Sequence, residues 1–183
     1  MKNYIIFGDS HIDIFRYMNN KQQDYRFHSL EVPGATAQGA VNPNSKTNAL
    51  QIFSNCLNRL ENIKKYDKFM IMLGEVDCGF VIWVRSKKYK ISADEQIKNS
   101  VNNLFKFIKN IVEKYFNKSD IIIIGSILPT IKDNTDKKFL NGARREVDAK
   151  LKERINKTLE YNNKLKEESN KNGYKYIDIT KYT

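Results

Sequence analysis

The sequence predicts an α/β fold, a three-layer α/β/α sandwich with a five-stranded parallel sheet between layers of helices. Strand-like apolar runs and amphipathic helix-like segments alternate five times along the chain. Some of the runs are apolar throughout, as parallel strands covered on both faces are, and the clearest is Ile121–Ile124. Residues 1–183 contain no linker, internal repeat or low-complexity tract, so we expect a single domain.

The first half of the chain supplies three of the predicted strands. The first strand runs into Gly8, and an amphipathic segment, residues 12–18, follows at once. An alternating run over residues 25–32 predicts the second strand, which is followed by a loop of small residues. Apolar residues at helical spacing from Ala49 to Ile63 predict a helix, and residues 67–73 predict the third strand.

The second half begins with residues 75–90, which show no clear period, so we expect a long loop with a short helix near residues 80–84. A capping box at Ser92 starts a helix whose apolar stripe ends at Tyr115. A strand over residues 120–124 and a polar loop follow. The last helix carries a stripe over residues 147–165 and stops at Asn172-Gly173, and residues 174–179 predict the fifth strand.

Composition narrows the possible classes of protein. No apolar run approaches the roughly 20 residues of a membrane-spanning helix, and the N-terminus lacks the shape of a signal peptide, so we expect a cytoplasmic protein. The net charge of +11 comes from lysines scattered among acidic residues without a nucleic-acid-binding motif, so no specific nucleic-acid partner is expected. Two cysteines and two histidines offer neither a disulfide framework nor metal-ligand spacing, so we expect no cofactor. The oligomeric state stays open.

Candidate chemistry begins where the first strand ends, at Gly8-Asp9-Ser10. Gly8 allows a sharp turn, and the side chains of Asp9 and Ser10 can accept hydrogen bonds from the first amides of the next helix. A serine at the carboxyl end of a central strand stands where open α/β sheets bind ligands. Loops containing glycine follow the second and third strands and converge on the same edge of the sheet. Ser10 is therefore a candidate nucleophile.

In this arrangement the chain resembles the SGNH/GDSL hydrolase family over essentially its whole length. The motifs that carry the resemblance are Gly8-Asp9-Ser10, a glycine after the second strand and Gly74-Glu75-Val76-Asp77 after the third, together with Pro129 and Tyr161-Asn162. The resemblance implies a flavodoxin-like, SGNH-type sandwich and a serine esterase or deacylase. Its substrate would be an acyl ester of a small molecule or of a glycan.

The resemblance also implies roles for single residues. Ser10 would be the nucleophile, and its own N–H would donate one hydrogen bond to the oxyanion. Gly39 would supply a second oxyanion donor, with Gly34 as the alternative. Glycine suits this role because it permits close approach of the backbone to the substrate.

Two features depart from the family. Val76 stands where the family has an asparagine that donates to the oxyanion, and valine has no side-chain donor. Residues 178–181 contain no histidine where the family has its Asp-x-x-His base, so we expect a domain that lacks its C-terminal segment. A serine without a base is a poor nucleophile at neutral pH. The alternative hypothesis is therefore a catalytically inactive module that binds a glycan or an acyl group.

The two histidines do not complete a triad by sequence alone. His11 follows Ser10 directly, and adjacent side chains diverge, so we interpret His11 as a residue at the mouth of the pocket. With Asp9, it is a candidate for contact with the substrate. His28 lies within the second strand, where we expect a packed or edge position.

The remaining candidates for substrate binding follow the third strand. Glu75 and Asp77 act either as acceptors for substrate hydroxyls or as caps of the following turn. Trp83 and Arg85 predict an aromatic and basic rim that would stack on sugars or attract anions. Arg144 could approach the edge of the site, but we expect it on a solvated helix face.

Overall fold

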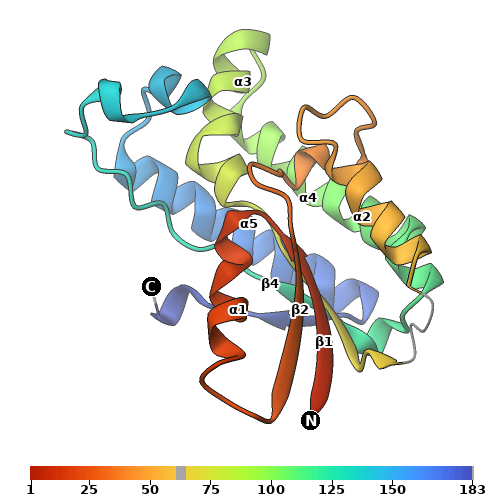
Figure 1. The fold of residues 1–183 in the computed structure, drawn as a ribbon. Coiled ribbons are helices and arrows are strands. Elements are labelled where there is room, and N and C mark those ends of the chain that lie inside the picture. The colour runs from red at the N-terminus through yellow and green to blue at the C-terminus, as the bar shows by residue number, and fades with distance from the viewer. Residues whose placement is uncertain (61–64, 183) are drawn as a thin grey trace.

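The computed structural model describes residues 1–60 and 65–182 and confirms the predicted α/β fold (Figure 1). All strand pairs are parallel, and the strand order is β2-β1-β3-β4-β5, the flavodoxin-like order. The predicted five-stranded parallel sheet is thus confirmed. Its strands are β1 (Lys2–Gly8), β2 (Tyr25–Glu31), β3 (Lys68–Met72), β4 (Ile121–Ile124) and β5 (Lys175–Ile177).

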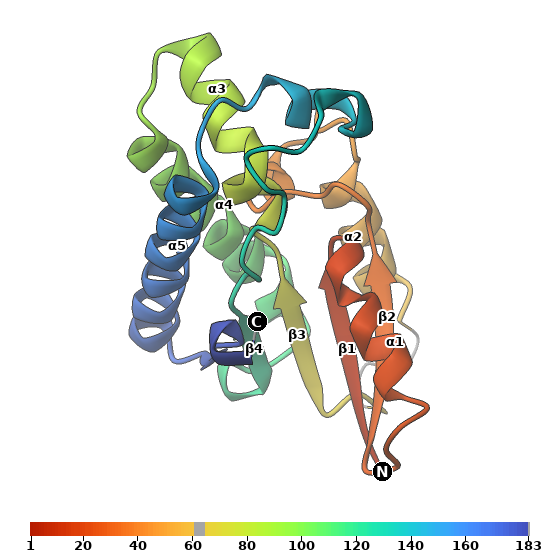
Figure 2. The same cartoon turned by 90° about the vertical axis from the view of Figure 1, so that its left-hand side faces the viewer.

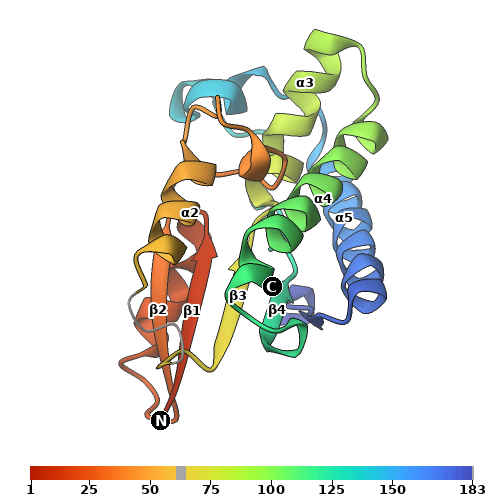
Figure 3. The same cartoon turned by 90° about the vertical axis from the view of Figure 1, so that its right-hand side faces the viewer.

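Helices lie on both faces of the sheet, but unevenly. Helix α1 packs on one face, whereas α2, α4 and α5 form the layer on the other (Figures 1 and 3). None of the helices within residues 1–60 and 65–182 is long and apolar enough to traverse a bilayer. The helices are α1 (Asp13–Met18), α2 (Ala49–Asn58), α3 (Ile82–Tyr89), α4 (Ala93–Asn110) and α5 (Leu151–Asn172).

Side-chain alternation along the strands creates two apolar cores. Phe7 of β1 points into the larger core, where its ring stacks on Phe53 at 4.8 Å and meets Phe69 edge-on at 5.1 Å. Its neighbour Ile6 points to the opposite face and packs in the smaller core with Ile12. Central strands buried on both faces explain why the runs in the sequence are apolar throughout.

The expectation of a long loop over residues 75–90 is wrong. Residues Asp77–Val81 form a π-helical turn that continues directly into α3. A π turn holds more residues than an α turn, so the buried residues Val76, Cys78 and Ile82 do not recur at helical spacing. The missing period in the sequence reflects this local geometry and not a loop.

Other boundaries differ by a few residues. Helix α4 ends at Asn110 and a separate 3-10 turn follows, so the predicted helix to Tyr115 is too long. Helix α5 starts at Leu151, after a 3-10 helix at Gly142–Glu146, and not at residue 147. Ile63, the last residue predicted for α2, lies outside the described residues.

Helix α5 fixes the loops at the carboxyl ends of β3 and β4. The Tyr161 hydroxyl donates to the Leu73 carbonyl at 2.9 Å, and the Asn162 amide exchanges two hydrogen bonds with the backbone of Ser126 at 2.7 and 2.9 Å. Gly74 has a φ of 137°, and a Cβ there would lie 2.3 Å from the Tyr161 ring. Figure 2 shows α3 and the segment after β4 gathered at this end of the sheet.

Candidate active site

Ser10 is the first residue of the 3-10 helix Ser10–Ile12, directly beyond the carboxyl end of β1. The turn requires glycine at position 8, because a Cβ there would lie 2.4 Å from Ile12 Cγ2 and 2.5 Å from the Met72 carbonyl oxygen. The Ser10 side chain is exposed. The fold therefore presents this serine at the edge of the sheet where the sequence predicts the site.

Asp9 and His11 form a hydrogen-bonded pair beside Ser10. Asp9 is 1% exposed, and its Oδ1 accepts from the His11 backbone N–H at 2.9 Å and lies 2.8 Å from His11 Nδ1. The hydrogen bond with Asp9 raises the pKa of His11, although burial opposes the shift. With the Nδ1 proton held by Asp9, a neutral His11 carries its free lone pair on Nε2. Sequence reasoning asked only whether His11 could pair with Ser10, and it missed the pairing of His11 with Asp9.

Glu75 is a second carboxylate near the same nitrogen of His11, Nδ1. Its Oε2 is 3.9 Å from His11 Nδ1, is buried, and has no hydrogen-bond partner among the described residues. Burial raises the pKa of Glu75, while the nearby positive charges of His11 and Arg144 oppose the shift. Asp9, His11 and Glu75 line a small cleft together with Ser126. The structure thus brings three of the predicted substrate-binding residues together.

Asp77 has a different position from Glu75. It is completely buried, and its carboxylate accepts hydrogen bonds from the amides of Ala37 and Gln38 at 2.7 and 3.0 Å and from the Ser100 hydroxyl at 2.9 Å. Burial raises the pKa of Asp77, and these hydrogen bonds oppose the shift. Asp77 therefore connects the loop after β2 to α4, and its acceptors are occupied within the protein.

The predicted oxyanion donors differ in their surroundings. The Gly39 N–H donates to the Thr36 carbonyl at 3.1 Å and to the Thr36 hydroxyl at 2.8 Å, so this amide already has acceptors in its own loop. Gly34 is exposed and has a φ of 74°. Val76 is buried and adds no polar atom to the cleft.

Trp83 and Arg85 lie apart from the residues that line the cleft at His11. The indole N–H of Trp83 donates to the Cys78 carbonyl at 2.8 Å, and the ring packs against the larger core. Arg85 donates to the Gln38 side-chain carbonyl and lines a separate cavity of about 400 Å³. Trp83 and Arg85, the predicted aromatic and basic rim, therefore do not line the cleft at His11.

Arg144 was expected on a solvated helix face, and that expectation is wrong. Its guanidinium carbon lies 4.3 Å from the centre of the Phe80 ring, and its charge partly opposes the upward shifts in the pKa values of His11 and Glu75. The polar segment between β4 and α5 folds back over the π turn and carries Arg144 with it. No periodicity in the sequence marks this return, and only the Arg-Arg pair indicated a basic side chain here.

No protein-family model and no curated protein sequence matches this chain. Solved structures do match it along nearly its whole length. An extracellular lipase from Streptomyces rimosus superposes with a TM-score of 0.57 at 11% identity, over 99% of this chain and 81% of the lipase. The acetyl xylan esterase AlAXEase gives 0.56 at 13% identity, over 98% and 78% of the two chains. A carbohydrate acetylesterase family member from Sinorhizobium meliloti gives 0.57 at 13%, over 97% and 83%. The chain therefore has the fold of these lipases and esterases.

Proposed function

We propose that the protein hydrolyses acyl esters and that Ser10 Oγ is its nucleophile. The observation that carries the proposal is the exposed Ser10 beside the Asp9–His11 pair at the carboxyl end of β1. The pair supplies the two groups that a serine nucleophile needs, a base and a carboxylate that orients it. Acetylated carbohydrates are the substrate class to test first, since structures with this fold include an acetyl xylan esterase and a carbohydrate acetylesterase.

In the proposed reaction, His11 takes over the role of general base. Consecutive helical side chains diverge, so the Ser10 Oγ proton passes to His11 Nε2 through one bridging water, a reach that general-base catalysis allows. Oγ bonds to the carbonyl carbon, and the alcohol leaves with the proton that His11 returns. Water, deprotonated by the same nitrogen, then attacks the acyl carbon. The bond from that carbon to Ser10 Oγ breaks, Oγ takes the proton back from His11, and the carboxylic acid leaves.

Charge around the reacting atoms supports this sequence of steps. Asp9 and Glu75 both lie near Nδ1 of the imidazole, and their negative charges stabilise the imidazolium that forms when His11 accepts the proton. The Ser10 N–H is the first donor to the oxyanion. Gly34 is the proposed second donor, because the Gly39 N–H already donates to Thr36.

Labelling with a fluorophosphonate probe tests the nucleophile directly. Mass spectrometry is expected to find the probe on Ser10, and Ser10→Ala and His11→Gln are expected to lower acetyl-ester hydrolysis by about a thousandfold or more. Ser119→Ala, which changes an exposed serine elsewhere, serves as the matched control and should keep full activity. Unchanged hydrolysis in Ser10→Ala would overturn the proposal.

A second candidate function is a binding module for a glycan or an acyl group. Two observations favour it: the Gly39 amide is occupied, and the apolar Val76 offers no donor to an oxyanion. This candidate predicts that no acyl ester is turned over and that Ser10 resists the probe. It also predicts glycan binding that survives Ser10→Ala, which calorimetry with acetylated and deacetylated xylan fragments measures.

A further inference from the structure

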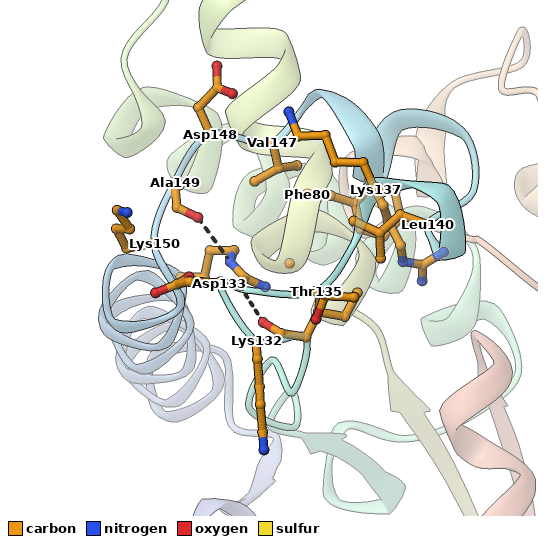
Figure 4. A pocket seen from close by; sticks show the side chains of 14 residues that line it. Phe80, Lys132, Asp133, Thr135, Lys137, Leu140, Val147, Asp148, Ala149 and Lys150 are labelled. Carbon is orange, nitrogen blue, oxygen red and sulfur yellow. Dashed lines mark hydrogen bonds and ion pairs between the residues drawn. The ribbon is translucent and has the colours of Figure 1, made fainter.

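A cavity of about 230 Å³ lies between the π turn, the segment after β4 and the start of α5 (Figure 4). Arg154, 5% exposed, holds this region together by donating to the carbonyls of Ile131 and Ala149. These two hydrogen bonds tie the beginning and the end of the segment between β4 and α5 to the same arginine. The cavity therefore lies in a part of the fold that hydrogen bonds hold in place.

The lining of the cavity is strongly basic. Two acidic side chains also line it, and both are paired: Asp133 lies 3.7 Å from Arg154, and Asp148 lies 2.9 Å from Lys87, which is not part of the lining. In the part of the chain that the structure describes, no ion pair engages the other basic lining residues, Lys132, Lys137, Arg144 and Lys150. The cavity therefore carries an excess of positive charge that its own carboxylates do not neutralise.

The cavity and the cleft at His11 have no lining residue in common, but residues next to both of them are in contact. Gly79 and Phe80 line the cavity, and a Cβ on Gly79 would lie 2.8 Å from Glu75 Oε1. Arg144, which also lines the cavity, packs on Phe80 and acts electrostatically on His11 and Glu75. A molecule whose ester reaches Ser10 thus has an adjacent basic recess for another of its groups.

We propose that this cavity is a subsite for an anionic group of the substrate, a carboxylate or a phosphate carried on the sugar that bears the acyl ester. The inference rests on the proposed ester hydrolysis, and it specifies in addition that the substrate is negatively charged. Guanidinium and ammonium groups bind both anions through charge-assisted hydrogen bonds. Thr135 adds a hydroxyl to the same lining.

Three probes that differ only at C6 test the subsite. They are mono-acetylated forms of methyl glucoside, methyl glucuronoside and methyl glucoside 6-phosphate, which are neutral, a carboxylate and a phosphate. Binding to Ser10→Ala is measured by calorimetry at low and high salt, and hydrolysis by the unmodified protein is measured in parallel. At least one anionic probe is expected to bind roughly tenfold more tightly than the neutral one at low salt, with a smaller ratio at high salt.

Lys137 is the lysine chosen for substitution, because the Lys132 side chain extends away from the other lining side chains in Figure 4. In the Ser10→Ala background, Lys137→Ala is expected to lower the anionic-to-neutral binding ratio several-fold, and Lys137→Arg to keep it. Lys138→Ala is the matched control: Lys138 is the next residue, lies outside the lining and pairs with Asp136 at 2.9 Å. It should leave the ratio unchanged.

The outcomes separate the subsite from the ester hydrolysis. Hydrolysis of all three probes at the same kcat/KM, with equal binding, overturns the subsite and leaves the esterase standing. Tight binding of an anionic probe without turnover overturns the esterase and supports an anion site in a binding module. A ratio that falls equally in Lys137→Ala and Lys138→Ala also overturns the subsite, since general surface charge then explains the preference.

Discussion

Glu75 and Asp77 are both carboxylates of the segment after β3, yet their surroundings are opposite. Asp77 is fully buried and receives three hydrogen bonds, from two backbone amides and a hydroxyl. Glu75 has a buried oxygen without a hydrogen-bond partner in the described part of the chain, 3.9 Å from His11. A carboxylate whose acceptors are all occupied holds the fold, whereas one left unpaired beside an imidazole is available for chemistry.

The largest effect should come from removing the Asp77 carboxylate. Asp77→Ala leaves the amides of Ala37 and Gln38 and the hydroxyl of Ser100 without their acceptor in a buried site. We expect the free energy of unfolding to fall by about 3–5 kcal/mol. Urea denaturation followed by circular dichroism measures it, and a loss below about 1 kcal/mol would contradict the structural role of Asp77.

Ser100→Ala removes one of the three hydrogen bonds to Asp77 and should have a smaller effect. The carboxylate keeps its two backbone donors, so the expected loss is about 1–2 kcal/mol. The same denaturation experiment reads it out. Ester hydrolysis should stay unchanged, because Ser100 lies on α4 and is not among the residues that line the cleft at His11. A large loss of activity in a well-folded Ser100→Ala protein would break the distinction between the two carboxylates.

Glu75→Gln should change stability in the opposite direction. Burial raises the pKa of Glu75, so its contribution to stability is full below its ordinary value of 4.5 and is lost as the pH rises through the raised pKa. At neutral pH the variant should be more stable than the unmodified protein by about 1 kcal/mol. The difference in stability between the variant and the unmodified protein should shrink toward acid pH, and melting temperatures measured across a pH series would show this. Lower stability of the variant at pH 7 would contradict this reading.

The smallest expected effect is a shift in the pH–rate profile. The hydrogen bond with Asp9 raises the pKa of His11, and only neutral His11 can accept a proton, so activity should rise with pH through a midpoint above 6.5. Glu75 also raises the pKa of His11 through its charge. In Glu75→Gln the midpoint should therefore move down, with kcat/KM for an aryl acetate as the readout. An upward shift would exclude Glu75 as a charge partner of His11.

Much of the fold could be predicted because the three central strands, β1, β3 and β4, are mostly apolar and are each closed by a glycine at or just after the last residue. The position of Ser10 followed from the same pattern. The segment after β3 could not be predicted, because the π turn at Asp77–Val81 removes the helical period that sequence reasoning relies on. The hydrogen bond from the His11 amide to Asp9 is a cap that the sequence predicts, but the side-chain pair was missed because it depends on the His11 ring turning back to the same carboxylate oxygen. Arg144 reaches the site through a long-range return of the chain that has no local signal.

The hydrogen bonds to Asp77 have a consequence for the loop after β2. The amides of Ala37 and Gln38 lie about forty residues from their acceptor along the chain and donate to a carboxylate that solvent does not reach. Their deuterium uptake should therefore be as slow as that of the central strands, although the loop has no strand or long helix. Hydrogen exchange at these two amides would then report the opening of the whole molecule, from a stretch that looks like a surface turn.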